Sequence, residues 1–368
     1  MRIDRVHLEN FRNYTAAEVS FAPDCNVIFG ENAQGKTNLL EAIVYLSGGK
    51  SPRARRDAEL IRFEADDARI TGSVFSRGRD FTLDVRLGRT KRRKIEVNGV
   101  AAKRAAELSS VLGTVYFCPE DLLLIRAGAS ERRRFMDQAL SQLRPRYAEA
   151  LAEYNRLYEH KTRILRDSED YPALRDTLPD FNLRMAQVGA VLIYFRARFC
   201  ERLALYAAAA HRECSGGREE LALSYETVKT VTDPMAGQEV IFRQLLDHQA
   251  SHFEAELASK LCLSGPHKDD IAVSIGGSAA RQYSSQGQTR TAALAFKLAE
   301  REIYKEITGE APVLLLDDVL SELDAKRQEF VLNRISGDQV FISCCEEDRL
   351  GELLGGKVLK IEGGQVAE

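Results

Sequence analysis

The sequence predicts an α/β fold that is interrupted by a mainly α-helical lobe. Strand-like and helix-like patterns alternate near both ends of the chain, whereas helical periodicity dominates the middle. The two strongest site motifs, around Lys36 and Asp317, are 281 residues apart, which exceeds the length of a typical domain. We therefore expect one α/β lobe built from residues 1–110 and 265–368, with residues 111–264 inserted as the helical lobe.

The composition is that of a folded protein with a large core. Of its 368 residues, 44% are hydrophobic and 29% are charged, and the net charge is −3, so any nucleic-acid surface must be a local basic patch. The sequence has no run of about 18 apolar residues and no signal-peptide core, which predicts a cytoplasmic protein without a membrane segment. The seven cysteines form no CxxC pair, which argues against a zinc site.

Strands and helices are placed by their periodicity and by glycine and proline. The first part predicts strands at 1–11 and 25–30, a helix at 35–49 that ends at Gly48 and Gly49, and a hairpin at 79–99. In the helical lobe, the periodicity predicts four helices, at 130–143, 144–165, 182–214 and 234–260. The two long helices on either side of the DSEDYP segment are expected to return antiparallel as a short coiled-coil-like arm. In the last part, strands are predicted at 271–275, 312–318, 339–345 and 357–364. Helices are predicted between them at 283–304 and 325–335.

A glycine-rich turn joins the strand at 25–30 to the following helix. It reads Gly30, Glu31, Asn32, Ala33, Gln34, Gly35, Lys36, Thr37, Asn38, which contains a GxxxxGK[ST] motif between a strand and a helix. Its glycines let backbone N–H groups converge on phosphates, and the helix N-terminus and Lys36 add positive charge. Thr37 offers a hydroxyl to Mg²⁺. The turn therefore predicts binding of a nucleoside triphosphate.

A second motif is the acidic end of the apolar segment at 312–318. Its continuous apolar run is typical of a central parallel strand, and the carboxyl ends of such strands are where ligands bind. We assign Asp317 to Mg²⁺ coordination and Asp318, with Lys36, to catalysis, Asp318 orienting or deprotonating the attacking water. The alternative is a solvated strand end without a ligand.

The helix segment at 283–305 begins with an unusually polar stretch. Ser285, Gly287 and Gln288 offer a hydroxyl, bare backbone and an amide at a helix start, which could form a second anion site. The alternative is a helix that Ser285 merely caps.

Six segments together resemble the RecF recombination-mediator family, whose members are SMC-like ABC-type ATPase heads. In chain order they are LENFRNY, GENAQGKTNLLEAIVYLSGGKSPR, PEDLLLIRAGASERRRFMD, SGPHKDD, SSQGQTR and LLLDDVLSELD. The resemblance implies a P-loop ATPase head with a helical lobe, and ATP and Mg²⁺ as cofactors. It also implies that Ser285, Gly287 and Gln288 form a signature motif that reaches the γ-phosphate held by another subunit, with Asp324 lining the same interface.

The same resemblance implies a role in recombinational DNA repair and replication-fork maintenance. It predicts an ATP-dependent homodimer on gapped DNA that works with RecR and RecO in loading a recombinase. The ATPase is expected to be stimulated by DNA. Two departures from many ABC-type ATPases favour slow hydrolysis that acts as a release timer. The second acidic residue is Asp318 rather than glutamate, and no histidine lies near Ser343.

Three other segments give weaker expectations. Arg12 reaches the nucleotide phosphates or is a plain surface arginine. Glu120 falls where a water- and metal-sensing loop would lie, although that loop usually carries glutamine. His267, Asp269 and Asp270 are interpreted as part of a structural loop rather than as metal ligands, because no fourth ligand accompanies them.

Local positive charge predicts where DNA would bind. Residues 50–104 contain 16 lysines and arginines against 8 acidic residues. The candidate DNA contacts are Arg55, Arg56, Lys91, Arg92, Arg93 and Lys94. No recognition helix or aromatic row is visible, so binding to duplex DNA and to single-strand/duplex junctions should be largely sequence-independent. The alternative is a solvated charged face.

Other functions fit the sequence less well. The ATPase subunit of an ABC-type transporter is disfavoured by the missing histidine and by the arm-like insertion. An SMC-type structural tether would need hundreds of coiled-coil residues and a hinge. A metabolic P-loop kinase leaves the polar stretch at Ser285 unexplained.

Overall fold

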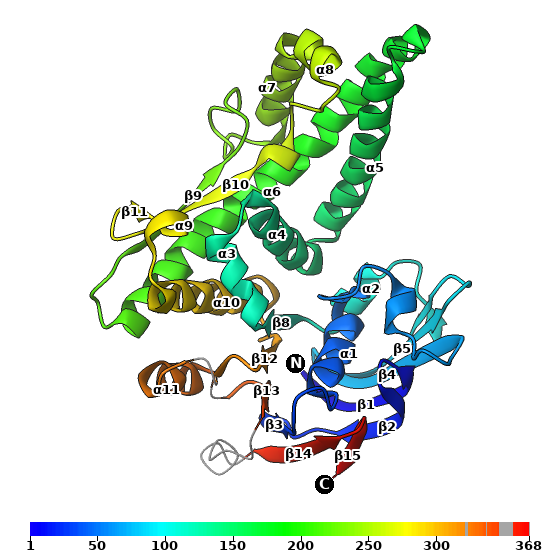
Figure 1. The fold of residues 1–368 in the computed structure, drawn as a ribbon, viewed down its shortest axis with the longest axis vertical. Coiled ribbons are helices and arrows are strands. Elements are labelled where there is room, and N and C mark those ends of the chain that lie inside the picture. Colours follow the sequence, from blue (N-terminus) through cyan, green and yellow to red (C-terminus); the bar gives the residue numbers. More distant parts are fainter. Residues whose placement is uncertain (321–322, 336, 346–355, 368) are drawn as a thin grey trace. The chain divides into compact units, whose positions relative to one another are not determined.

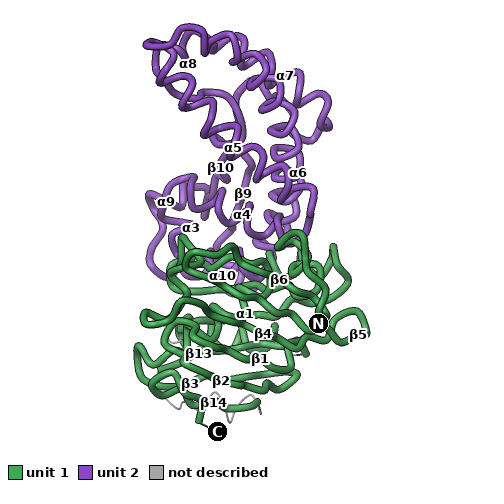
Figure 2. Tube along the Cα trace, turned by 90° about the vertical axis from the view of Figure 1, so that its right-hand side faces the viewer, with its two compact units in different colours: residues 1–121, 300–368 green, residues 122–299 purple. Residues whose placement is uncertain are grey.

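The computed structural model describes residues 1–320, 323–335, 337–345 and 356–367. The chain forms two compact units, unit 1 of residues 1–121 and 300–368 and unit 2 of residues 122–299 (Figure 2). These boundaries differ from the predicted ones at residues 110 and 265. Strand β8 (Thr114–Phe117) belongs to unit 1 because it pairs with β12 (Val313–Asp317).

Two six-stranded sheets form unit 1 (Figure 1). The first sheet is antiparallel in the order β2-β1-β4-β5-β6-β7, and the second has the order β15-β14-β3-β13-β12-β8, parallel except for β15. The strands not yet given are β1 (Arg2–Phe11), β2 (Tyr14–Ser20), β3 (Cys25–Phe29), β4 (Asp67–Ser76), β5 (Arg79–Gly88), β6 (Lys94–Val97), β7 (Val100–Ala101), β13 (Val340–Cys344), β14 (Lys357–Glu362) and β15 (Gln365–Ala367). The hairpin predicted at 79–99 is confirmed as β5 and β6.

A single hydrophobic core joins both sheets through helix α1 (Lys36–Gly48). It contains Leu8 of β1, Leu40 of α1, Ile70 of β4 and Leu315 of β12, all fully buried. All five residues of β12 are buried, as expected for a central parallel strand. Helix α1 ends as predicted, because Gly49 adopts a left-handed conformation that lets its N–H reach the Tyr45 carbonyl. The short helix α2 (Ala106–Ser109) and α11 (Ala325–Arg334) complete unit 1.

Unit 2 is mainly helical, with one small antiparallel sheet. Its helices are α3 (Leu123–Arg126), α4 (Ala129–Leu143), α5 (Pro145–Asp167), α6 (Leu178–Ser215), α7 (Gln238–Ser251), α8 (Phe253–Ser259), α9 (Ala280–Tyr283) and the first part of α10 (Gln286–Thr308). The sheet has the order β11-β10-β9, with β9 (Leu221–Glu226), β10 (Asp270–Ile275) and β11 (Ser278–Ala279). This sheet explains why residues 265–275 belong to unit 2 and not to the α/β unit.

Two predicted helices have different bounds in the structure. The helix expected at 234–260 is divided into α7 and α8 at His252, whose ring stacks on His248 at 3.9 Å between centroids. The helix expected from residue 283 begins at Gln286, after the separate short helix α9.

The predicted arm is formed by α5 and α6, which lie side by side and run in opposite directions (Figure 1). Near its tip a small apolar cluster contains Leu165, Leu178 and Cys262. The arm is also tied to α8 by a buried ion pair, in which the Lys161 ammonium lies 2.5 Å from a Glu256 carboxylate oxygen. The Glu256 carboxylate accepts a further hydrogen bond of 2.7 Å from the Leu263 N–H.

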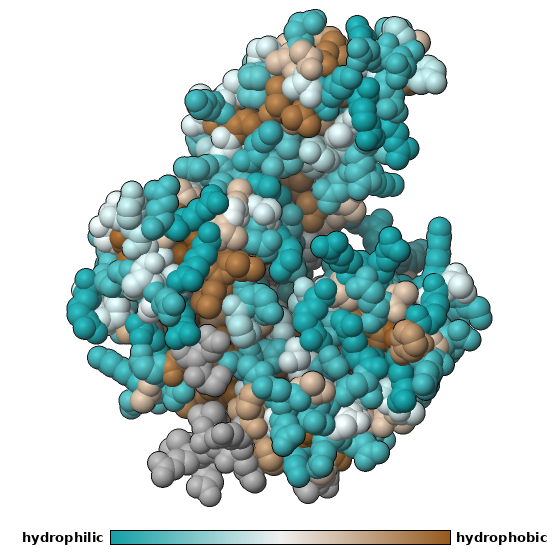
Figure 3. All heavy atoms as spheres, viewed as in Figure 1, coloured by the Kyte–Doolittle hydropathy of each residue, from teal (hydrophilic) through white to brown (hydrophobic). Residues whose placement is uncertain are grey.

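Hydrophilic residues cover most of the face shown in Figure 3, and apolar residues reach it in separate patches. In the part of the chain that the structure describes, every helix is too short or too polar to span a membrane.

Candidate functional site

The glycine-rich turn lies between β3 and α1 of unit 1, where the sequence predicts it. Gly30 and Gly35 have φ angles of 151° and 123°, and a Cβ on Gly30 would lie 2.3 Å from the Ile361 carbonyl oxygen. These two positions therefore require glycine. Lys36 is only 4% exposed, and its ammonium donates hydrogen bonds to the carbonyls of Gly30 at 2.6 Å and Glu31 at 3.1 Å. The turn thus curls around the lysine ammonium.

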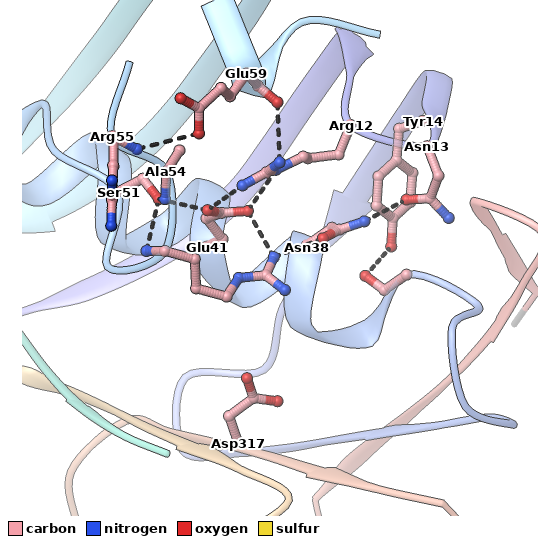
Figure 4. Close-up of polar contacts among 12 residues, drawn as sticks. Arg12, Asn13, Tyr14, Asn38, Glu41, Ser51, Ala54, Arg55, Glu59 and Asp317 are labelled. Atoms are coloured by element: carbon pink, nitrogen blue, oxygen red, sulfur yellow. Dashed lines mark hydrogen bonds and ion pairs between the residues drawn. The ribbon is translucent and has the colours of Figure 1, made fainter. Parts of the chain in front are cut away.

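Neighbouring elements hold this turn in shape from both sides. The Asn13 amide donates to the Gln34 carbonyl at 2.7 Å. The Tyr14 hydroxyl donates to the Gly35 carbonyl at 3.0 Å (Figure 4). On the β14–β15 hairpin, the Gly363 N–H donates to the Gln34 side chain at 2.6 Å. A turn fixed in this way is preorganised to bind an anion. Asn13 and Tyr14 follow directly on Arg12 in the LENFRNY segment, but of the three only Arg12 is predicted from the sequence as a site residue.

The acidic strand end meets the start of α1, although the two are far apart in sequence. The Thr37 hydroxyl donates to Asp317 Oδ1 at 3.0 Å, across 280 positions of the chain. Ser343 of β13 donates to the same oxygen at 2.7 Å, and the Tyr116 hydroxyl of β8 donates to Oδ2 at 2.6 Å. The predicted association of the two motifs is therefore present, whereas the two other donors were not foreseen.

Asp318 lies beside this cluster in a strained backbone conformation. Its φ of 54° is in the left-handed region, and such strain in a non-glycine residue is often found at functional sites. Its N–H donates to Ser343 Oγ at 2.9 Å. Burial raises the pKa of Asp318, the charge of Lys36 opposes this, and the charge of Asp317 adds to it. A carboxyl group with a raised pKa is better able to accept a proton than an ordinary aspartate.

The residues at this site fit a magnesium ion with nucleotide phosphates. The Thr37 hydroxyl and the Asp317 carboxylate are oxygen donors that lie in contact, and Mg²⁺ prefers to be bound by one or two protein groups together with substrate phosphates. Within the described residues, no group of three or more His, Cys, Asp or Glu side chains could hold a metal ion.

Arg12 is held by internal contacts on all of its nitrogen atoms. Its Nε and Nη2 each lie 2.9 Å from a carboxylate oxygen of Glu41, and its Nη1 donates to the Glu59 carbonyl at 2.9 Å (Figure 4). Glu41 is fully buried. Burial tends to raise the pKa of Glu41, but hydrogen bonds from Arg12 and Ser51 and the charge of Arg53 together lower it. These contacts favour a structural role for Arg12 over the expected phosphate contact.

A basic pocket of about 900 Å³ lies next to the turn in unit 1. It is lined by Arg12, Asn13, Asn38, Arg53, Arg56, Ala58, Glu59, Ile61, Phe63 and Arg89. Phe63 is 95% exposed. Its loop is held by Arg89, whose guanidinium donates to the carbonyls of Ala65, Arg62 and Phe63 at 2.7, 2.9 and 3.0 Å. An exposed aromatic ring beside arginines suits a ligand that combines a planar group with negative charge, such as a nucleotide.

The polar start of α10 is a capping box in unit 2. The Ser285 N–H donates to the Gln288 side chain at 2.7 Å, and the Gln288 N–H donates to Ser285 Oγ at 3.2 Å. The Gln288 amide also donates to Glu219 at 2.8 Å. Ser285 is exposed, and its hydroxyl uses an oxygen lone pair in the cap, so its proton remains available to a ligand. Gly287 lies in the first turn of the same helix.

Two more candidate residues, Asp324 and Glu120, lie in short local elements of unit 1. Asp324 is the N-cap of α11, where its side chain accepts a hydrogen bond of 3.0 Å from the Arg327 N–H. The preceding Ser321 and Glu322 lie outside the described residues. Glu120 is exposed in a short 3-10 helix, Pro119–Leu122.

The loop of His267, Asp269 and Asp270 has the contacts of a structural element of unit 2. Asp269 is fully buried and accepts hydrogen bonds from Arg196, Tyr225 and Thr227 at 2.7, 2.5 and 2.7 Å. Asp270 forms a bidentate ion pair with Arg132, whose Nε and Nη2 donate to the two carboxylate oxygens at 2.6 and 2.8 Å. His267 Nε2 lies 2.9 Å from the Cys262 carbonyl, so Nε2 carries the proton and Nδ1 accepts from the Tyr154 hydroxyl at 2.8 Å.

The neutral state of His267 predicts a pH dependence of stability. Burial lowers the pKa of His267 from 6.5 to about 4. As the pH falls, His267 takes up a proton in the unfolded chain before it does so in the folded chain. The contribution of His267 to stability should therefore be complete above pH 6.5 and should fall as the pH decreases toward 4. Urea unfolding between pH 7.5 and 4.5 should show a smaller loss of stability in His267→Gln than in the unaltered chain. An identical pH dependence in both proteins would contradict this assignment.

Five of the six candidate DNA contacts are exposed, and the sixth, Arg93, is partly buried. Arg55, Arg56, Lys91, Arg92 and Lys94 are exposed on unit 1. Arg93 instead points inward, where it donates to the Gly49 carbonyl and to Tyr45 OH and lies 3.6 Å from Asp57. These contacts favour a structural role for Arg93 over the predicted DNA contact, since its guanidinium fastens the β5–β6 loop to the end of α1.

Comparison with known proteins agrees with this geometry. A family model described as RecF/RecN/SMC N terminal domain matches residues 2–360. The chain is similar to two proteins described as DNA replication and repair protein RecF, from Lachnospira eligens at 37% identity and from Agathobacter rectalis at 39% identity. In both cases the match covers 100% of this chain and 99% of the relative.

Solved structures give the same result. A structure titled recombination mediator protein RecF-ATPrS in RecFOR pathway has a TM-score of 0.92 and 33% identity, over 99% of this chain and 97% of that chain. An Smc head bound to the C-winged helix domain of ScpA has a TM-score of 0.58 at 16% identity, over 100% of this chain and 96% of that chain, and this likeness concerns the fold alone. The fold and the arrangement of its motifs therefore agree with the sequence relationships, and the chain belongs to the RecF family of SMC-like ABC-type ATPase heads.

Proposed function

We propose that this protein is an ATP-driven DNA-binding switch that acts in recombinational repair and replication-fork maintenance. The observation that carries the proposal is the contact of Thr37 with Asp317, because it joins the phosphate-binding turn to an acidic strand end. Relatives described as RecF DNA replication and repair proteins, and a related structure titled as an ATP complex, support ATP as the nucleotide.

Each residue of the site has a chemical role in this proposal. Lys36 and the N–H groups of the turn bind the β- and γ-phosphates. Thr37 and Asp317 hold Mg²⁺, which neutralises phosphate charge when it is bound. Asp318 orients the attacking water and accepts its proton. The basic pocket with Phe63 receives the base and ribose of the same nucleotide, and Arg12 shapes that pocket through Glu41.

The dimer completes the site in this proposal. Ser285, Gly287 and Gln288 contact the γ-phosphate of the nucleotide held by a second copy, and Asp324 lines the same interface. These contacts exist only in the dimer, so ATP binds the dimer more tightly than the monomer and favours dimerisation. Slow, DNA-stimulated hydrolysis then removes the shared phosphate, ends the dimer and serves as a timer for release. Partnership with RecR and RecO and help in loading a recombinase on gapped DNA follow from the family.

The proposal is tested by light scattering coupled to size exclusion, with ATP, with ADP and without nucleotide, each with and without gapped DNA. We expect a dimer with ATP alone, more dimer with ATP and DNA, and a monomer with ADP. A single mass under all conditions would contradict the switch.

The exposed basic loop between β5 and β6 provides a test of DNA contact. Replacing Lys91, Arg92 and Lys94 by alanine should weaken DNA binding evenly across sequences and reduce the slope of log affinity against log salt by about 0.9 for each lost phosphate contact. Arg93 should be left in place because it holds the loop. The control replaces Lys229, Arg243 and Lys260, which are exposed on unit 2, and removes the same charge. Equal slopes in both variants would show that the loop is only a solvated hairpin.

A further inference from the structure

The Asp317 carboxylate is surrounded by hydroxyl groups from three different elements. Oδ1 accepts from Thr37 of α1 at 3.0 Å and from Ser343 of β13 at 2.7 Å. Oδ2 accepts from Tyr116 of β8 at 2.6 Å. Asp317 is only 4% exposed, so its carboxylate oxygens depend on such donors in place of water.

The sheet register explains how Tyr116 reaches this carboxylate. Strands β8 and β12 are parallel neighbours, with Tyr116 paired to Leu315 and Phe117 paired to Leu316. Asp317 follows directly on β12. The Asp317 carboxylate can only accept a hydrogen bond, so the Tyr116 hydroxyl is the donor of this contact.

The three donors, Thr37, Ser343 and Tyr116, differ in their other contacts and roles. Thr37 belongs to the phosphate-binding turn, where its own oxygen is a candidate metal ligand. Ser343 is shared, because its oxygen also accepts from the Asp318 N–H at 2.9 Å. The Tyr116 hydroxyl, in contrast, bonds to the second oxygen of Asp317 and so restricts rotation of the carboxylate about its Cβ–Cγ bond.

We propose that Tyr116 is a positioning residue of the site: its hydroxyl holds the Asp317 carboxylate in the orientation that Mg²⁺ binding requires. Hydrogen bonds behind a metal-binding carboxylate commonly change metal affinity by about 10- to 100-fold. Tyr116 lies outside the phosphate-binding turn, the acidic strand end and the polar stretch at Ser285, so none of those motifs points to it. The inference rests on the proposed nucleotide function of the site.

The test is a magnesium titration of nucleotide binding in Tyr116→Phe, followed with a fluorescent ATP analogue. This substitution removes one oxygen and keeps the ring. We expect unchanged nucleotide affinity without Mg²⁺, and a half-maximal Mg²⁺ concentration that is about tenfold higher than in the unaltered chain. Tyr116→Met, which fills similar space without a hydroxyl, should give the same shift and provides a second variant if the Phe ring packs poorly.

Tyr45→Phe is the matched control. Tyr45 is fully buried in the same unit, and its hydroxyl also donates to a carboxylate, that of Asp57, at 2.8 Å. It should lose a similar hydrogen bond without changing the magnesium midpoint.

A spectroscopic readout is available because the chain has no tryptophan. Adding Mg²⁺ with ATP should alter the near-ultraviolet tyrosine spectrum of the unaltered chain and of Tyr45→Phe, and the change should be smaller in Tyr116→Phe.

The possible failures can be told apart. If the unaltered chain shows no Mg²⁺-dependent nucleotide binding, the proposed function of the site is wrong. If the unaltered chain responds and both Tyr116 variants have its magnesium midpoint within about twofold, the positioning role of Tyr116 is wrong. A tyrosine spectrum that Mg²⁺ and ATP leave unchanged in the unaltered chain would also contradict the role.

Discussion

Replacing Lys36 by alanine is expected to abolish measurable ATP binding. The lysine ammonium lies inside the turn, 4% exposed, where phosphates would replace the carbonyls of Gly30 and Glu31 as its partners. Each charge-assisted hydrogen bond is worth about 1.5–3 kcal/mol, so losing two lowers affinity by about 100-fold or more. Lys36→Arg keeps the charge but not the compact ammonium, and should bind weakly and hydrolyse poorly.

Calorimetric titration with ATP measures this effect, and Lys50→Ala is the control. Lys50 is exposed just after α1, so its replacement removes the same charge without touching the turn. Normal ATPase activity in both Lys36 variants would disprove the assignment of the site.

Replacing Lys161 by methionine is expected to cause the largest loss of stability in unit 2. Lys161 and Glu256 are almost completely buried and lie 2.5 Å apart, and they tie the arm to α8. Removing one partner of a buried ion pair typically costs about 3–5 kcal/mol, because an uncompensated charge remains. Denaturant unfolding of Lys161→Met should show this loss.

The double variant Lys161→Met with Glu256→Gln should recover most of the lost stability. Glutamine keeps an oxygen that can accept from the Leu263 N–H, and no buried charge remains. Lys260→Met is a suitable control, since its pair with Glu169 is exposed and such pairs contribute little. A double variant as unstable as Lys161→Met would show that the loss comes from packing and not from the unpaired charge.

Local patterns were sufficient to predict the elements that form the candidate nucleotide site. The strand, turn and helix around Lys36 and the buried strand before Asp317 each have a complete sequence signature, and their sequence separation correctly indicated an insertion. The arm and the β5–β6 hairpin were predicted for the same reason, because each is a pair of neighbouring elements joined by a clear break.

The remaining features depend on contacts between distant segments. β8 contains only four residues, and what assigns it to unit 1 is its pairing with β12, about 200 positions later. The hydroxyls of Tyr116 and Ser343 join the site through that sheet register. Arg93 has the sequence appearance of a surface arginine, and only the neighbouring Tyr45 and Gly49 show that it points inward.

The central claim, that two copies complete each other's sites, is tested most directly by mixing two inactive variants. Lys36→Ala damages the phosphate-binding turn. Ser285→Asp keeps a good N-cap for α10 but places a negative charge where the γ-phosphate of the second copy would lie.

Each variant alone should lack ATPase activity, and Ser285→Asp should still bind ATP as a monomer. In a mixed dimer one site is doubly damaged and the other is intact, so the account predicts that mixing restores ATPase activity. If Ser285→Asp alone forms an ATP-dependent dimer and hydrolyses ATP at the unaltered rate, the polar start of α10 is only a helix cap and the account is contradicted.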